Sequence, residues 1–196
     1  LGVKSNFTIY DTQDSLRLIT LILRDFNIDA KNTKPRMLLS RISSAKNELI
    51  DHETFLSNTQ LSAEKDAAIE SVIAQVYREY QNRLTIANAF DFDDLIGSTV
   101  ALMQLFPEVA NMYRRRFRHI MVDEYQDTNH AQYMLIKELV GTVAASADSP
   151  PPGELCVVGD ADQSIYAFRG ATIRNIEEFE RDYPNASTIL LEQNYR

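Results

Sequence analysis

Cysteine is nearly absent from this chain of 196 residues, which excludes a scaffold held together by disulfide bonds. The single cysteine, Cys156, cannot form an internal disulfide and lies inside an apolar run, so we expect a buried, unreactive thiol. A reducing compartment suits this usage, and the cytoplasm is the simplest one. Histidine is also sparse: His52, His119 and His130 have no cysteine or histidine neighbours at metal-ligand spacing, so no zinc site is predicted.

Long apolar runs and an N-terminal targeting signal are missing as well. No run approaches the ~18 consecutive apolar residues that a membrane span requires, so we expect no membrane partner. The first residues, LGVKSN, contain no apolar signal region and no initiator methionine. We therefore expect this chain to be a segment of a longer protein.

Glycine is too scarce and too widely spaced to build a phosphate-binding loop. None of the six glycines begins the pattern Gly-x-x-x-x-Gly-Lys-Ser/Thr. The backbone cradle and the lysine that would hold nucleotide phosphates are therefore absent from this chain.

Acidic residues outnumber basic ones, and the net charge is −8. This balance argues against a broad nucleic-acid-binding face, because phosphate contacts need lysine and arginine, although a local groove is compatible with it. The densest basic run, 114–116 with Arg118, is expected to be a solvated face or a helix C-terminus. With 44% apolar and 24% charged residues, the composition is that of a globular protein of one or two domains.

The first part of the chain, residues 8–90, has the pattern of an almost entirely helical unit. Asp11 or Thr12 can cap a first helix, Pro35 can start a second, and Ser62 opens a long one with apolar residues at helical spacing. No alternating strand pattern is visible in these residues.

After residue 90 the pattern changes to helices separated by short apolar runs. We expect helices over residues 92–106, 129–140 and 173–182, and a loop over residues 144–153. The apolar runs, at 119–122, 155–158 and 188–191, indicate parallel strands that are covered on both faces. The sequence therefore predicts an α/β fold with a parallel sheet, preceded by a helical subdomain.

Two acids, Asp123 and Glu124, follow the first of these strands. In open α/β sheets, ligands bind beyond the carboxyl ends of the strands, so these acids are placed where a site would form. One carboxylate there can hold Mg²⁺ and its neighbour can activate a water molecule. The alternative is that both acids simply favour the N-terminus of the next helix.

The segment after the second strand, 159–171 (GDADQSIYAFRGA), also has residues suited to a site. Gly159 permits a tight turn, and the amide of Gln163 can sense a phosphate or its attacking water. Tyr166, Phe168 and Arg169 can offer stacking surfaces to unpaired bases. The alternative for the two aromatic residues is an ordinary place in the core.

Four segments taken together, in this order, resemble the core of superfamily 1 DNA helicases of the UvrD/PcrA/Rep family. They are DFDDL at 91–95, VDEYQD at 122–127, VGDADQSIYAFRG at 158–170 and LEQNYR at 191–196. The resemblance implies that residues 1–90 are the helical subdomain 1B, inserted into a RecA-like P-loop NTPase domain, 1A. Residues 91–196 would be the latter part of domain 1A. The phosphate-binding loop would then precede Leu1, and a second RecA-like domain would follow Arg196.

The resemblance assigns nucleotide chemistry to the second segment, which corresponds to the family's motif II. Asp123 would coordinate Mg²⁺ and Glu124 would be the catalytic base. Gln126 and Asp127 would connect the nucleotide site to neighbouring motifs.

The third and fourth segments resemble motifs III and IV. By that resemblance, Gln163 contacts the γ-phosphate, while Tyr166 and Phe168 contact single-stranded DNA; many relatives have tryptophan in place of Phe168. Tyr195 would stack on adenine, and Arg196 would stabilise the charge of the transition state. For the last two residues the alternative is a frayed chain terminus.

The DFDDL segment at 91–95 is interpreted first as a helix N-terminus with capping acids, and second as a contact with the DNA path or a support for it. Residues 7–11 and 42–47 resemble the entry to subdomain 1B.

The function that this resemblance implies is an ATP-dependent 3′-to-5′ DNA helicase that uses ATP and Mg²⁺. Its partners would be single-stranded and partially duplex DNA, with accessory repair or replication proteins. We expect the isolated chain to be inactive, because the phosphate-binding loop is absent. The alternatives are a helicase-nuclease subunit, a non-catalytic helical interaction module, and a single-strand binder that needs no nucleotide.

Overall fold

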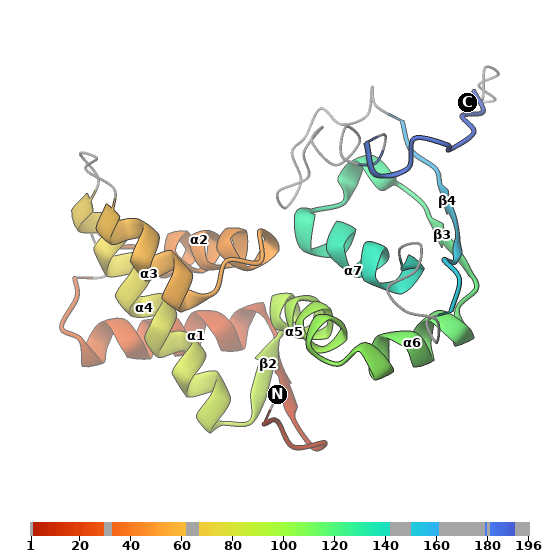
Figure 1. Ribbon diagram of the computed structural model, residues 1–196. Helices are drawn as coiled ribbons and strands as arrows, with labels where there is room; N and C mark the ends of the chain where they lie inside the picture. The colour runs from red at the N-terminus through yellow and green to blue at the C-terminus, as the bar shows by residue number, and fades with distance from the viewer. Residues whose placement is uncertain are drawn as a thin grey trace.

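The computed structural model describes residues 2–29, 33–61, 67–141, 150–160, 179 and 181–190. It is a mixed α/β structure with two short parallel sheets and mostly helical content (Figure 1). Its elements, in chain order, are β1 (Thr8–Tyr10), α1 (Thr12–Asp25), α2 (Pro35–Asn47), α3 (His52–Leu61), α4 (Ala67–Ile86), β2 (Ala89–Asp91), α5 (Phe92–Leu105), α6 (Pro107–Arg116), β3 (His119–Val122), a short 3₁₀ turn (Tyr125–Asp127), α7 (His130–Val140) and β4 (Glu154–Val157).

Helices α1 to α4 form one packed unit, here called the helical block. Two of its helices start where the sequence predicts: Asp11 caps α1 in a capping box with Asp14, and Pro35 occupies the first turn of α2. The third predicted start, at Ser62, lies outside the described residues. The apolar faces of α1, α2 and α4 meet in a closed core. The members of that core are Ile19, Ile22, Leu23, Leu38, Ile42, Ala45, Ile73, Val76, Tyr77, Tyr80, Leu84 and Ala89.

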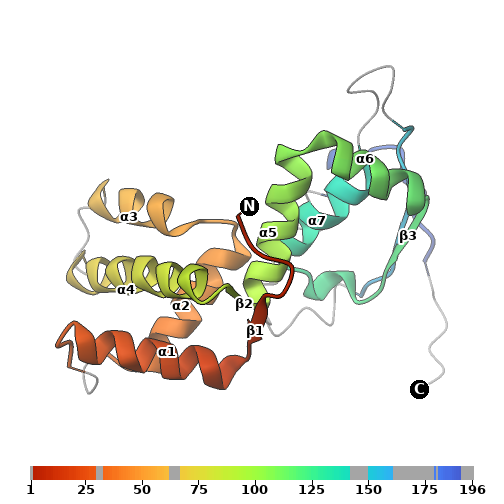
Figure 2. The same ribbon diagram turned by 90° about the horizontal axis from the view of Figure 1, so that it is seen from below.

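The two ends of the helical block lie side by side as a parallel pair of strands (Figure 2). Thr8 pairs with Ala89 and Tyr10 with Asp91. The prediction of helix across residues 8–90 is confirmed for four helices and wrong for these two strands. Each strand has three residues, which is too short for an alternating pattern to be visible in the sequence. The pairing means that the chain enters and leaves the helical block at the same place.

Helix α5 lies between the helical block and the remaining elements (Figure 1). It packs against α2 on one side and against α6 and α7 on the other. The predicted helices 92–106 and 129–140 are confirmed as α5 and α7, and the run of arginines forms the last turn of α6, as predicted. Arg114 donates hydrogen bonds to the main-chain oxygen of Glu138 (2.7 Å) and to its Oε2 (3.0 Å), which fixes α6 against α7.

Strands β3 and β4 pair in parallel, with Ile120 opposite Leu155. The prediction that these strands are covered on both faces is wrong within the described part of the chain. Met121 is 78% exposed, and Cys156, predicted to be buried, is exposed too. Alternate residues are half-buried, because only one face of this sheet is covered by described residues.

The expected third strand is not found in the described residues. Ile189 and Leu190 are in irregular structure and are 81% and 76% exposed, while Leu191 lies outside the described residues. Of the helix predicted over 173–182, the described residues Phe179, Arg181 and Asp182 are helical. Among the described residues, no helix is both long and apolar enough to cross a membrane.

Candidate functional site

The loop that follows β3 presents two carboxylates to solvent. Asp123 and Glu124 are both exposed at the carboxyl end of the strand. Glu124 has φ 50° and ψ 42°, in the left-handed region that a residue with a side chain rarely adopts. A hydrogen bond from the backbone N–H of Glu124 to Asp123 Oδ1 (2.9 Å) supports this conformation. Such a backbone costs ~1–3 kcal/mol and tends to occur at functional sites, where the surroundings hold it in place.

The side chain of Gln126 joins this loop to the loop that follows β4. Gln126 is 3% exposed; its Nε2 donates to Glu124 Oε2 (2.7 Å), and its Oε1 accepts from the backbone N–H of Asp160 (3.0 Å). The backbone reinforces the link, because the N–H of Tyr125 donates to the carbonyl of Val158 (2.9 Å). The carboxyl ends of the two strands therefore form one connected edge, as the sequence predicts for parallel strands.

Gly159 lies where these two loops come close together. A Cβ atom at this position would lie 2.8 Å from Gln126 Oε1 and 3.4 Å from its backbone nitrogen. The sequence suggested a tight turn as the reason for this glycine, but its φ lies outside the left-handed region. The structure shows a different reason, which is the close approach of Gln126.

The helix that follows, α7, is capped by Asn129 and not by the two acids. Asn129 Oδ1 accepts from the backbone N–H of Gln132, and Gln132 Oε1 accepts from the backbone N–H of Asn129, both at 2.9 Å. The capping contacts of α7 therefore do not involve Asp123 or Glu124, and the alternative that these acids favour a helix N-terminus stays a prediction. Asp127, predicted to link motifs, is exposed in the 3₁₀ turn before the cap.

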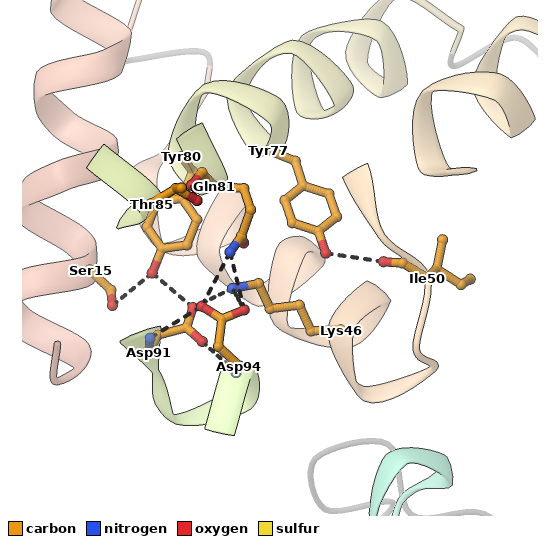
Figure 3. Close-up of polar contacts among 9 residues, drawn as sticks. All are labelled: Ser15, Lys46, Ile50, Tyr77, Tyr80, Gln81, Thr85, Asp91 and Asp94. Carbon is orange, nitrogen blue, oxygen red and sulfur yellow. Dashed lines mark hydrogen bonds and ion pairs between the residues drawn. The ribbon is translucent and has the colours of Figure 1, made fainter. Parts of the chain in front are cut away.

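A second polar centre lies in the interior, between the helical block and α5 (Figure 3). Lys46 Nζ donates to Asp91 Oδ2 (2.7 Å) and to Asp94 Oδ1 (2.8 Å), and the three side chains are at most 10% exposed. The Tyr80 hydroxyl, 2.9 Å from both Asp91 Oδ2 and Ser15 Oγ, extends the cluster to α1. The same two acids form the capping box of α5, so the predicted capping role is confirmed.

Burial and the charges of this cluster shift the pKa values of its acids and of Tyr80. Burial works to raise the pKa of Asp91, but Lys46 and the hydrogen bonds to this carboxylate outweigh it, so its pKa lies below the usual range. Burial and the neighbouring charge of Asp91 raise the pKa of Asp94, despite the contact with Lys46. Burial, followed by the Asp91 charge, raises the pKa of Tyr80 far above that of a free tyrosine.

Lys46 was not predicted from the sequence to be a functional residue. Its position was a usable signal, because it follows Ile42 by four residues on the apolar stripe of α2, where a charged residue needs a buried partner.

Six of the predicted site residues lie outside the described residues, so the structure does not place them. They are Gln163, Tyr166, Phe168, Arg169, Tyr195 and Arg196. The structure does bring together Asp123, Glu124 and Gln126 with the start of the next motif at Gly159 and Asp160.

Within the described residues, no group of three or more metal-binding side chains is present. The donor set still suits Mg²⁺, which keeps several water ligands and needs only one or two carboxylates from a protein. Asp123 and Glu124 provide such carboxylates on an exposed edge.

Comparison with known proteins gives the class of this α/β chain. The family model for the UvrD/REP helicase N-terminal domain matches residues 1–184. The chain therefore belongs to the UvrD/REP helicase family.

Several curated relatives match the chain over its whole length. It is 62% identical to "ATP-dependent DNA helicase UvrD1" of Mycobacterium tuberculosis (strain ATCC 25618 / H37Rv) over 196 residues, which is 25% of that protein. It is 50% identical to "ATP-dependent DNA helicase PcrA" of Bacillus subtilis (strain 168), of which it covers 24%. The PcrA of Staphylococcus aureus (strain NCTC 8325 / PS 47) is 46% identical, with 25% covered. The chain thus spans about a quarter of the length of these relatives.

Proposed function

We propose that this chain is a segment of an ATP-dependent 3′-to-5′ DNA helicase, in which it supplies part of the nucleotide site and part of the DNA path. One observation carries the proposal: the loops after β3 and β4 are joined through buried Gln126 and present Asp123 and Glu124 on one edge. Relatives named as ATP-dependent DNA helicases support it.

In this proposal, Asp123 holds Mg²⁺ and Glu124 is the general base that takes a proton from the attacking water. Mg²⁺, when bound, neutralises charge that develops on the phosphate oxygens. The left-handed backbone at Glu124 and the hydrogen bond from Gln126 Nε2 fix the direction of this carboxylate. Gln126 links the carboxylate of Glu124 to the loop that follows β4, and Asp127 takes part in the same link.

The remaining roles are proposed from the motifs alone. Gln163 and Arg196 contact the γ-phosphate, and Tyr195 stacks on adenine. The DNA contacts are assigned to Tyr166, Phe168 and Arg169.

We further propose that residues 1–90 are the inserted subdomain 1B and residues 91–196 the latter part of RecA-like domain 1A. The pairing of β1 with β2 supports an insertion, because it closes the helical block at one point. The chain on its own is proposed to be inactive, because it lacks the lysine and glycines of a phosphate-binding loop. The complete protein is proposed to act in the cytoplasm, in DNA repair or replication.

Unwinding of tailed duplexes by the complete protein that contains this chain tests the proposal. We expect ATP hydrolysis that single-stranded DNA stimulates, and unwinding of a duplex with a 3′ tail but not of one with a 5′ tail. Absence of DNA-stimulated hydrolysis would contradict the proposal and favour an interaction module.

The same assay distinguishes a simple helicase from a helicase-nuclease subunit and from a single-strand binder. Degradation of the DNA strands would point to a helicase-nuclease subunit. DNA binding that neither needs nor consumes ATP would point to a nucleotide-independent single-strand binder.

A further inference from the structure

The last turn of α2 ends in two adjacent buried polar residues, Lys46 and Asn47. Each is 7% exposed, although both residue types usually lie at the surface. A buried polar side chain is tolerated only when it has a hydrogen-bond or ion-pair partner. The partners of these two residues therefore show which elements their side chains connect.

Lys46 reaches the start of α5. Its two acceptors, Asp91 and Asp94, are the residues that cap this helix, and Asp91 is also the last residue of β2 (Figure 3). The ammonium group therefore fixes the end of α2 to the point where the chain leaves the helical block.

Asn47 reaches the start of α7. Its Oδ1 accepts a hydrogen bond from Asn129 Nδ2 at 3.0 Å, and Asn129 is itself 5% exposed. The other side-chain atom of Asn129, Oδ1, caps α7. This contact joins residues that are 82 positions apart in the chain.

The cap of α7 is continuous with the loop that carries Glu124. Thr128, next to Asn129, donates through Oγ1 to the carbonyl of Tyr125 at 2.7 Å. Tyr125 is followed by Gln126, whose Nε2 is bonded to Glu124. Hydrogen bonds and the chain between them therefore lead from the end of α2 to the Asp123–Asp127 loop.

We propose that Lys46 and Asn47 form a joint that positions the helical block against α5 and the Asp123–Asp127 loop. They are positioning residues, because neither lies at the candidate nucleotide site and Asn47 acts on it through Asn129. This inference rests on the proposed function, since it adds a way to link the helical block to the nucleotide site. The joint couples hydrolysis at the loop to the orientation of the helical block.

Asn47→Ala and the double variant Asn47→Asp/Asn129→Asp break the joint at Asn47, and both leave the candidate site residues in place. Asn129→Asp and Asn82→Ala serve as comparisons. Asn47→Ala removes the acceptor. Asn129→Asp keeps the side-chain oxygen that caps α7, and a turned Asn47 amide can still donate to it. The combined Asn47→Asp/Asn129→Asp variant places two carboxylates against each other with no donor between them. Asn82→Ala, at an exposed asparagine of α4, is the matched control.

Kinetics of DNA-stimulated ATP hydrolysis by the complete protein give the first readout. We expect Asn47→Ala and the double variant to lower kcat roughly three- to tenfold, a range typical of changes along a coupling network. The KM for ATP should stay within about twofold, because no proposed nucleotide contact is removed. Asn129→Asp and Asn82→Ala should stay close to the unmodified protein. The contrast between Asn129→Asp alone and the double variant tests the contact itself once the unfolding temperature of each variant has been measured, because two buried carboxylates also lower stability.

A distance measurement gives a second readout that does not need activity. Spin labels are placed at the exposed residues Glu53 on α3 and Glu108 on α6, in a protein whose other accessible cysteines, Cys156 included, are replaced. We expect a narrow distance distribution that broadens in Asn47→Ala and in the double variant, and stays narrow in Asn129→Asp.

The two readouts separate failure of the joint from failure of the proposed function. Unchanged kcat and unchanged label distances in the double variant would overturn the joint. If the unmodified protein does not hydrolyse ATP, the proposed function fails, and the label distances alone then decide whether the joint exists. Should Asn47→Ala not fold, the comparison of Asn129→Asp with the double variant still decides.

Discussion

The helical block and the β3–β4 sheet differ in how completely they bury their apolar residues. The core of the block consists of residues between Ile19 and Ala89, and most of them are fully buried. The sheet, by contrast, leaves Met121 and Cys156 exposed on one face. The helical block therefore has its own complete core, whereas the sheet that carries the candidate site does not bury both of its faces within the described residues.

The largest expected effect on stability comes from the buried charge cluster between the helical block and α5. Lys46→Met keeps most of the side-chain volume but leaves Asp91 and Asp94 buried without their cation. We expect a loss of about 3–5 kcal/mol in the free energy of unfolding, measured by chemical denaturation.

Arg41→Met is the control for this variant, because Arg41 makes an ion pair with Glu70 (2.5 Å) that is partly exposed. It should cost less than about 1 kcal/mol. Equal losses in the two variants would show that burial of the Lys46 cluster does not matter.

A truncation in the apolar core should have the next largest effect. Leu84 on α4 is 0% exposed. Leu84→Ala is expected to lower the free energy of unfolding by about 2–5 kcal/mol, because it removes buried methyl groups and leaves a cavity. If Leu84→Ala lowers the free energy of unfolding by less than the surface substitution Met121→Ser in the same denaturation experiment, the closed core is refuted.

At the candidate site, Gly159→Ala should have an intermediate effect. The new Cβ would lie 2.8 Å from Gln126 Oε1, so the Gln126 amide must turn away from Asp160 or the two loops must move apart, at a cost of about 1–3 kcal/mol. Gly97→Ala on α5 is the control, since its Cβ would meet only Leu49 Cδ2 at 3.8 Å. The comparison fails if the two alanine variants unfold at the same denaturant concentration.

Substitutions on the exposed face of the sheet should change the free energy of unfolding least. Met121 is 78% exposed, so Met121→Ser is expected to change the free energy of unfolding of this chain by less than about 0.5 kcal/mol. A loss as large as that of Leu84→Ala would mean that this face is covered, and the contrast between the two regions would disappear.

Features encoded by neighbouring residues could be predicted from the sequence. Asp11 and Pro35 mark helix starts by local rules, and the acids after β3 lie where the pattern of apolar runs places them. The ion pairs of Lys46 join residues 45 and 48 positions apart, and no local pattern contains them. The exposure of Cys156 was mispredicted for a similar reason, because an apolar run does not show whether another element covers it.

The candidate site was predicted in part. The place of Asp123 and Glu124 at the end of β3 was predicted, but the strained backbone of Glu124 and the packing of Gly159 on Gln126 depend on the meeting of two distant loops. The roles given to Gln163 and Arg196 stay predictions, since both lie outside the described residues.

The measurement that tests the central claim most directly is the DNA-stimulated kcat of Glu124→Gln in the complete protein. The control is Glu154→Gln, at the opposite end of the same sheet. If Glu124 is the general base, kcat should fall by roughly 10²–10⁴-fold while DNA binding and the unfolding temperature are retained. The control should keep its activity. A kcat for Glu124→Gln within about twofold of the control would contradict the assignment of hydrolysis to this loop.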